Sequence, residues 1–161
     1  MMAHNEERTP SVPVEGTGVS PLPAPVTTFG QWSRLSPLDF EIDFLERLVA
    51  RDRYYIDALR VLGELLTHRK SYERGLQVDQ RLARLLPYDP VVRYNLACSY
   101  ALVNARNEAI KALRRAIELG YDDLAFMHCD PDLDSVREHP EYRRLIKEHV
   151  ARHKPFRGRR R

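Results

Sequence analysis

Residues 90–123 constrain the fold of this chain most, because their apolar residues recur at helical spacing. In the second half of this stretch the apolar residues lie at positions i, i+1, i+4, i+7 and i+8: Ala109, Ile110, Leu113, Ala116 and Ile117. The first half places three more on one helical face: Leu96, Ala97 and Tyr100. The pattern predicts two amphipathic helices joined by a tight turn, with an apolar side left for a neighbour.

The same pattern occurs 34 residues earlier in the chain. Within residues 56–89, the equivalents of Leu96, Ala97, Tyr100 and Ala109 are Leu62, Gly63, Leu66 and Gly75. Small residues therefore recur where two helices must approach closely. One further step back, residues 38–52 match only the second helix of such a pair, and one step forward finds no match.

This period resembles the tetratricopeptide repeat, in which Leu precedes a small residue and further small and apolar positions follow at fixed offsets. The chain differs from common family residues at Arg93, Asp79 and Ala97, where Trp, a bulky aromatic residue and Gly are frequent. Residues 130–142 also resemble the closing segment of many bacterial tetratricopeptide proteins. The resemblance implies an all-α, right-handed helical solenoid of about two and a half repeats with a helical C-terminal cap.

The composition divides the chain into four parts. Residues 1–35 are rich in Pro and Gly and predict a disordered leader. Residues 36–123 are expected to form the repeats, and residues 124–151 the helical cap. Within the cap, helices are predicted to start at Asp130-Pro131 and at His139-Pro140. Residues 152–161 form a basic tail.

The first helix is predicted to begin where Ser36 precedes Pro37, because Ser caps a helix and Pro is favoured in its first turn. Its expected buried stripe consists of Phe40, Phe44, Leu45 and Leu48. We expect Asp89 to cap the helix that follows it and Gly120 to end the last repeat.

The basic tail carries six cations and no acid: Arg152, Lys154, Arg157, Arg159, Arg160 and Arg161. Removing these six from the formal charge of +3 leaves −3 for the rest of the chain. Phe156 lies between two of the cations, an arrangement that suits stacking on a nucleic-acid base. The tail is therefore either a solvated end or a contact for nucleic acid, an acidic partner or a membrane surface.

No motif in the sequence indicates catalysis, a metal or a cofactor. His128, Cys129 and Asp130 are adjacent ligand-type residues, but no second Cys/His pair stands at ligand spacing. The acidic residues between 122 and 134 are explained as helix caps, and a Gly-rich phosphate loop is absent. Without a secretory signal or a long apolar run, we expect a cytoplasmic protein that is not an enzyme.

The resemblance implies that the first helix of each repeat lines a concave face that binds other proteins. Outside the packing stripe, these two helices offer seven candidate partner-binding residues: Arg60, Glu64, His68, Tyr94, Asn95, Cys98 and Leu102. The predicted function is therefore a scaffold or adaptor that binds a partner peptide or protein. The alternative is an RNA- or ribosome-associated accessory protein that uses the basic tail.

Two arrangements of the concave face are compatible with the sequence. In the first, the groove is open, Arg60 pairs with a partner carboxylate and Tyr94 provides an aromatic anchor. In the second, the C-terminal helices of the chain itself cover Tyr94, Cys98 and Leu102, because a short array must hide its last apolar face.

Overall fold

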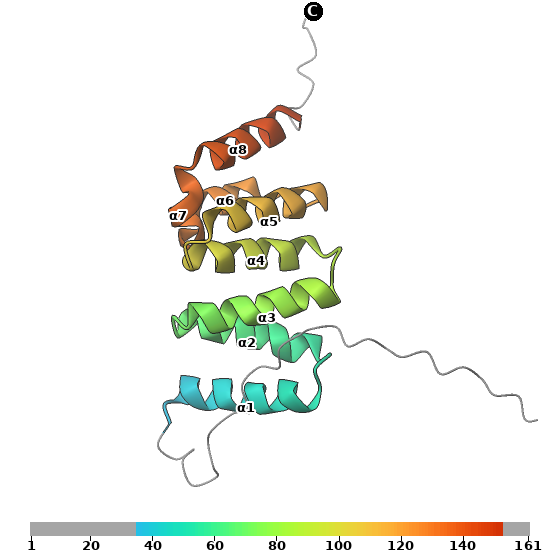
Figure 1. The fold of residues 1–161 in the computed structure, drawn as a ribbon, viewed down its shortest axis with the longest axis vertical. Helices are drawn as coiled ribbons and strands as arrows, with labels where there is room; N and C mark the ends of the chain where they lie inside the picture. Colours follow the sequence, from blue (N-terminus) through green and yellow to red (C-terminus); the bar gives the residue numbers. More distant parts are fainter. Residues whose placement is uncertain (1–34, 153–161) are drawn as a thin grey trace, which may run out of the picture.

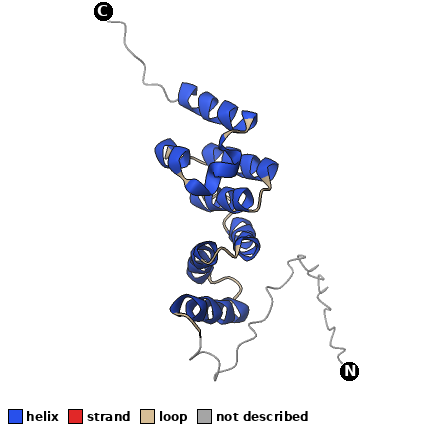
Figure 2. Ribbon diagram, turned by 90° about the vertical axis from the view of Figure 1, so that its left-hand side faces the viewer, coloured by secondary structure: helices blue, strands red, loops and turns tan. Residues whose placement is uncertain are grey.

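The computed structural model describes residues 35–152, which form helices joined by short turns (Figures 1 and 2). The helices are α1 (Pro37–Arg51), α2 (Ile56–His68), α3 (Tyr72–Leu85), α4 (Pro90–Leu102), α5 (Arg106–Glu118), α6 (Leu124–Cys129), the 3-10 turn η2 (Pro131–Leu133), α7 (Asp134–Arg137) and α8 (Pro140–Arg152). Residues 35–152 contain no strand, so the predicted all-α class is confirmed. The predicted leader, apart from Leu35, lies outside the described residues.

The helices follow one another along the long axis of the molecule (Figure 1). From α1 to α5, each helix packs on the one before it and the one after it. Helix α4 also contacts η2 and α7, whereas α5 contacts α7 and α8. In the part of the chain that the structure describes, no helix is long and apolar enough to cross a membrane.

One apolar core runs through the stack. Its largest fully buried side chains come from both halves of the chain: Val49, Leu59, Leu62, Leu66, Val78, Val92, Leu113, Met127, Leu133 and Val136. The apolar faces that the periodicity predicts for α2 and α5 are thus turned inward. Burial of this apolar surface is the main stabilising contribution to a fold of this kind.

Two helix pairs share the same local geometry. Helices α2 and α4 begin 34 residues apart, and so do α3 and α5. The turn inside each pair contains a residue with positive φ, Lys70 at 61° and Asn104 at 64°. Each turn is closed by the same backbone bond, from Ser71 N to Leu66 O in one and from Ala105 N to Tyr100 O in the other. The four helices predicted over residues 56–119 are present.

Side chains cap several helices at the positions that the sequence indicates. The hydroxyl of Ser36 accepts a hydrogen bond from Asp39 N, and the carboxylate of Asp89 accepts from Val91 N and Val92 N. Such bonds satisfy backbone N–H groups that have no partner inside the helix. Gly120, with φ of 103°, follows α5 in the left-handed region that favours glycine.

The predicted buried stripe of α1 is wrong in part. Phe40 and Phe44 are 41% and 52% exposed, and the buried apolar residues of this helix are Ile42 and Val49. Helix α1 packs mainly on α2, and two polar contacts join it to α3: Arg74 pairs with Glu46, and Arg81 donates to the carbonyl of Val49. The face of α1 that carries Phe40 and Phe44 therefore keeps much of its surface accessible.

Replacing Ala97 with Leu is expected to lower the free energy of unfolding by about 1–3 kcal/mol, because the added carbons overfill a packed interior. Ala97 has no exposed surface and occupies the position equivalent to Gly63. Urea denaturation measures the change. As a control, Ala50→Leu at an exposed position of α1 should stay within about 0.5 kcal/mol of wild type. Equal stability of both variants would show that Ala97 does not pack in this register.

Candidate functional site

All seven predicted partner-binding residues line one pocket of about 380 Å³, which we call the α2/α4 pocket. Arg60, Glu64 and His68 come from α2, and Tyr94, Asn95, Cys98 and Leu102 come from α4. The lining is completed by Gly63, Thr67, Asp79, Leu82 and Ser99 and by three residues from the C-terminal part of the fold: Phe126, Asp130 and Asp132. The helical offsets in the sequence therefore selected residues that the structure brings together.

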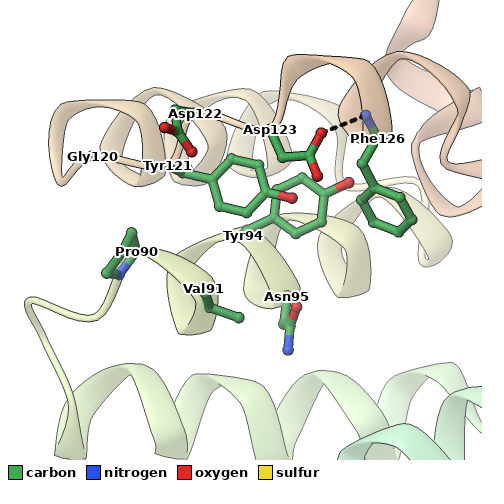
Figure 3. A pocket seen from close by; sticks show the side chains of 9 residues that line it. All are labelled: Pro90, Val91, Tyr94, Asn95, Gly120, Tyr121, Asp122, Asp123 and Phe126. Carbon is green, nitrogen blue, oxygen red and sulfur yellow. Dashed lines mark hydrogen bonds between the residues drawn. The ribbon is translucent and has the colours of Figure 1, made fainter.

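A second pocket, of about 400 Å³, adjoins the first and is called the Tyr121 pocket (Figure 3). It shares Tyr94, Asn95 and Phe126 with the α2/α4 pocket. Its other lining residues are Pro90, Val91, Gly120, Tyr121, Asp122 and Asp123. Because they share these residues, the two pockets adjoin along α4, and together we call them the groove.

Tyr94 forms part of the wall of this groove. Its side chain is 3% exposed, and its ring stacks on Tyr121 with centroids 4.2 Å apart and planes within 4° (Figure 3). The ring of Phe126 lies 6.1 Å away at a tilt. Because Tyr94 is covered in this way, Phe126, which is about half exposed, is the aromatic side chain open to a ligand here.

Asp130 ties α4 to the C-terminal part of the fold. Its buried carboxylate accepts a hydrogen bond from the Tyr94 hydroxyl at 2.6 Å and one from Asp132 N at 3.0 Å. The sulfur of Cys98 lies 3.6 Å from the same carboxylate. Burial raises the pKa of the Tyr94 hydroxyl, which therefore stays protonated and donates. The C-terminal segment thus covers Tyr94 and Cys98, whereas Leu102 is half-buried.

Cys98 has the wrong environment for a nucleophile. It is buried, and burial, followed by the charges of Asp130 and Asp132, raises the pKa of its thiol well above the ordinary value. A thiol is reactive only as the thiolate, which this environment disfavours. Cys98 therefore acts as a small packed side chain.

Asp79 is a buried acid at the base of the α2/α4 pocket. It is 7% exposed, and its Oδ2 accepts a hydrogen bond from the Ser99 hydroxyl. Burial raises its pKa to about 6; the Ser99 bond lowers it in part, and the charge of Glu64 raises it further. A Cβ on Gly63 would lie 3.1 Å from Asp79 Oδ1, so glycine leaves room for this carboxylate.

The remaining candidates differ in how strongly they are held. Arg60 donates to Asp89 Oδ2 at 2.7 Å, so α2 is linked to the N-terminal cap of α4. Glu64 and His68 are exposed, and Asn95 is half-buried. Arg60 is therefore engaged inside the protein, whereas Glu64, His68 and Asn95 present polar groups to the groove.

The seven candidate residues include none from α6 or from the turn that follows it, although one of the two expected arrangements has C-terminal helices over α4. Phe126, Asp130 and Asp132 lie outside the repeat pattern, and a helix of six residues is too short to show periodicity. The sequence does contain a signal for the start of α6, which is the capping residue Asp123. Its carboxylate accepts a hydrogen bond from Phe126 N at 2.9 Å (Figure 3).

The adjacent ligand-type residues and the basic tail were the other two groups of candidate residues in the sequence. His128 and Cys129 are exposed while Asp130 is buried, and within residues 35–152 no three His, Cys, Asp or Glu side chains gather as metal ligands. Arg152 is the last residue of α8. Its side chain and the rest of the basic tail lie outside the described part of the chain.

Comparisons with known proteins give one partial similarity. Over 58 residues the chain is 34% identical to a chloroplastic protein of Arabidopsis thaliana. The match covers 36% of this chain and 17% of that protein. No family model and no solved structure matches the chain.

Proposed function

We propose that this chain is a protein-interaction module, a short tetratricopeptide-like solenoid that binds a segment of a partner protein in the groove along α4. The 34-residue offset between equivalent helix starts, and the equivalent turns at Lys70 and Asn104, support the repeat assignment. The observation that carries the function is that all seven residues assigned to the concave face line a single pocket.

The groove offers the kinds of contact that peptide recognition requires. The helices that line the groove use their backbone N–H and C=O groups inside each helix. The groove must therefore recognise a peptide through its side chains. The amide of Asn95 can donate to and accept from the backbone of an extended peptide. Val91 and Phe126, both about half exposed, offer apolar surface in the Tyr121 pocket. An adaptor of this kind binds its partner and catalyses no reaction of its own.

Filling the groove is expected to abolish partner capture without unfolding the protein. Asn95 lines both pockets, so Asn95→Trp places a bulky side chain where they meet. The matched control is Lys111→Trp on the exposed face of α5, outside the groove. Quantitative affinity capture from cells that produce the protein compares both variants with wild type, and circular dichroism checks that each is folded.

Wild type and Lys111→Trp should capture the same partner, whereas folded Asn95→Trp should lose at least about nine-tenths of it, a change of about 1.4 kcal/mol in binding. Equal capture by both variants would place the binding surface elsewhere on the protein.

A further inference from the structure

The groove is lined by an unusual concentration of carboxylates. Four belong to the α2/α4 pocket and two to the Tyr121 pocket: Glu64, Asp79, Asp130, Asp132, Asp122 and Asp123. The basic side chains in the same lining are Arg60 and His68. Because Arg60 is bonded to Asp89, outside this lining, its charge is already balanced.

None of these six carboxylates forms an ion pair with any residue between 35 and 152. Elsewhere in the same range nine acidic residues do so: Asp39, Asp43, Glu46, Asp89, Glu118, Asp134, Glu138, Glu141 and Glu148. Five acidic residues outside the groove also form no ion pair within this range, so what distinguishes the groove is that its unpaired carboxylates are clustered. The negative charge there is left for a ligand to balance.

Within this acidic groove, Asp79 provides a hydrogen-bond acceptor that is held in a fixed position. Its Oδ2 is held by Ser99, whereas its Oδ1 receives no hydrogen bond from a described residue. Among the described residues that are not exposed, no side-chain oxygen or nitrogen is both fully buried and without a hydrogen bond, so Oδ1 keeps some solvent exposure, and Asp79 lines the α2/α4 pocket. A carboxylate that is only 7% exposed and still has one oxygen without a hydrogen bond is an oriented acceptor for a cationic donor.

The neighbouring Tyr121 pocket has a different chemistry. Val91 and Phe126 expose about half of their surface there, beside the half-buried Tyr121 (Figure 3). Asp122 and Asp123 lie at the same pocket. The α2/α4 pocket is therefore mainly acidic. The adjoining Tyr121 pocket exposes apolar side chains and has two acidic residues in its lining.

Resting on the proposed function, we infer that the segment bound in this groove is an extended basic peptide. A Lys or Arg side chain enters the α2/α4 pocket toward Asp79 Oδ1, between Glu64 and Asp132. An apolar side chain of the same peptide occupies the Tyr121 pocket. An acidic peptide would bring like charges against six carboxylates and is disfavoured.

The first experiment selects ligands without assuming their sequence. A phage-displayed library of random peptides is selected on the wild-type full chain, with prior removal of phage that bind Asn95→Trp. Enrichment of peptides that pair Lys or Arg with a nearby apolar residue is expected. Enrichment of acidic or neutral peptides would overturn the basic-peptide inference and leave the proposed function intact. No groove-dependent enrichment would overturn both.

The second experiment separates local charge from net charge. An enriched peptide is titrated, by fluorescence anisotropy, into wild type, into E64Q/D132N and into the control E73Q/E108Q, which removes the same charge at exposed sites outside the groove. The groove variant should bind about five- to tenfold more weakly and the control within about twofold. Affinity should also fall as salt rises. Equal affinities for the two variants would contradict the assignment of the cation to this pocket.

Discussion

Replacing Tyr94 with Ala is expected to lower the free energy of unfolding by about 3–5 kcal/mol, because it removes a large buried ring. The ring is stacked on Tyr121, and its hydroxyl donates to the buried carboxylate of Asp130. Truncation leaves a cavity and removes one hydrogen-bond donor from that carboxylate. Urea denaturation followed by circular dichroism gives the free energy of unfolding.

Two further substitutions separate the contributions of Tyr94. Tyr94→Phe keeps the stacked ring and removes only the bond to Asp130, so it should cost about 1–3 kcal/mol. Tyr88→Ala at a highly exposed position should stay within about 0.5 kcal/mol of wild type. If Tyr94→Ala behaved like Tyr88→Ala, the wall of the groove would not be packed as described.

The stability of the wild-type protein should decrease as pH rises from about 4 to about 6, because of Asp79. Burial raises the pKa of this carboxyl from 3.8 to about 6 in the folded state. Between these values the folded state binds more protons than the unfolded state, so raising the pH favours unfolding. The difference amounts to at most about 3 kcal/mol, and it is complete above pH 6.

Asp79→Asn should remove this pH dependence. The amide oxygen still accepts the hydrogen bond from Ser99, and the amide carries no charge to desolvate beside Glu64. The variant should therefore be more stable than wild type by about 2–3 kcal/mol at pH 7 and nearly equal to it at pH 4. Denaturant unfolding at each pH measures both proteins. Parallel pH profiles would show that Asp79 is not desolvated.

The sequence predicted the helices from residue 56 to residue 119 well because their signals are local. Apolar residues of α5 recur every three or four positions, and Asp89 with Pro90 marks the start of α4. The buried stripe of α1 was misplaced because a local signal is limited: periodicity shows only that Phe40 and Phe44 share a face. It does not show which face of α1 packs on α2.

The groove was predicted from one side only. Helical offsets placed Glu64, His68, Asn95 and Leu102 correctly along it. Its other wall depends on contacts between residues far apart in the chain, such as Tyr94 with Asp130, which are 36 positions apart. Asp79 stood out in the sequence as an acid where the repeat family has a bulky aromatic residue. Its role depends on Ser99, a partner that local spacing does not indicate.

Site-specific photo-cross-linking tests most directly whether the groove along α4 is the binding face. A benzophenone amino acid is placed at Asn95, which lines both pockets, and in a second sample at Lys111 on α5. After irradiation in cells that produce the protein, Asn95 should link to one defined segment of one partner, and Lys111 should not. Cross-links to that partner from Lys111 but not from Asn95 would contradict the assignment of the groove as the binding face.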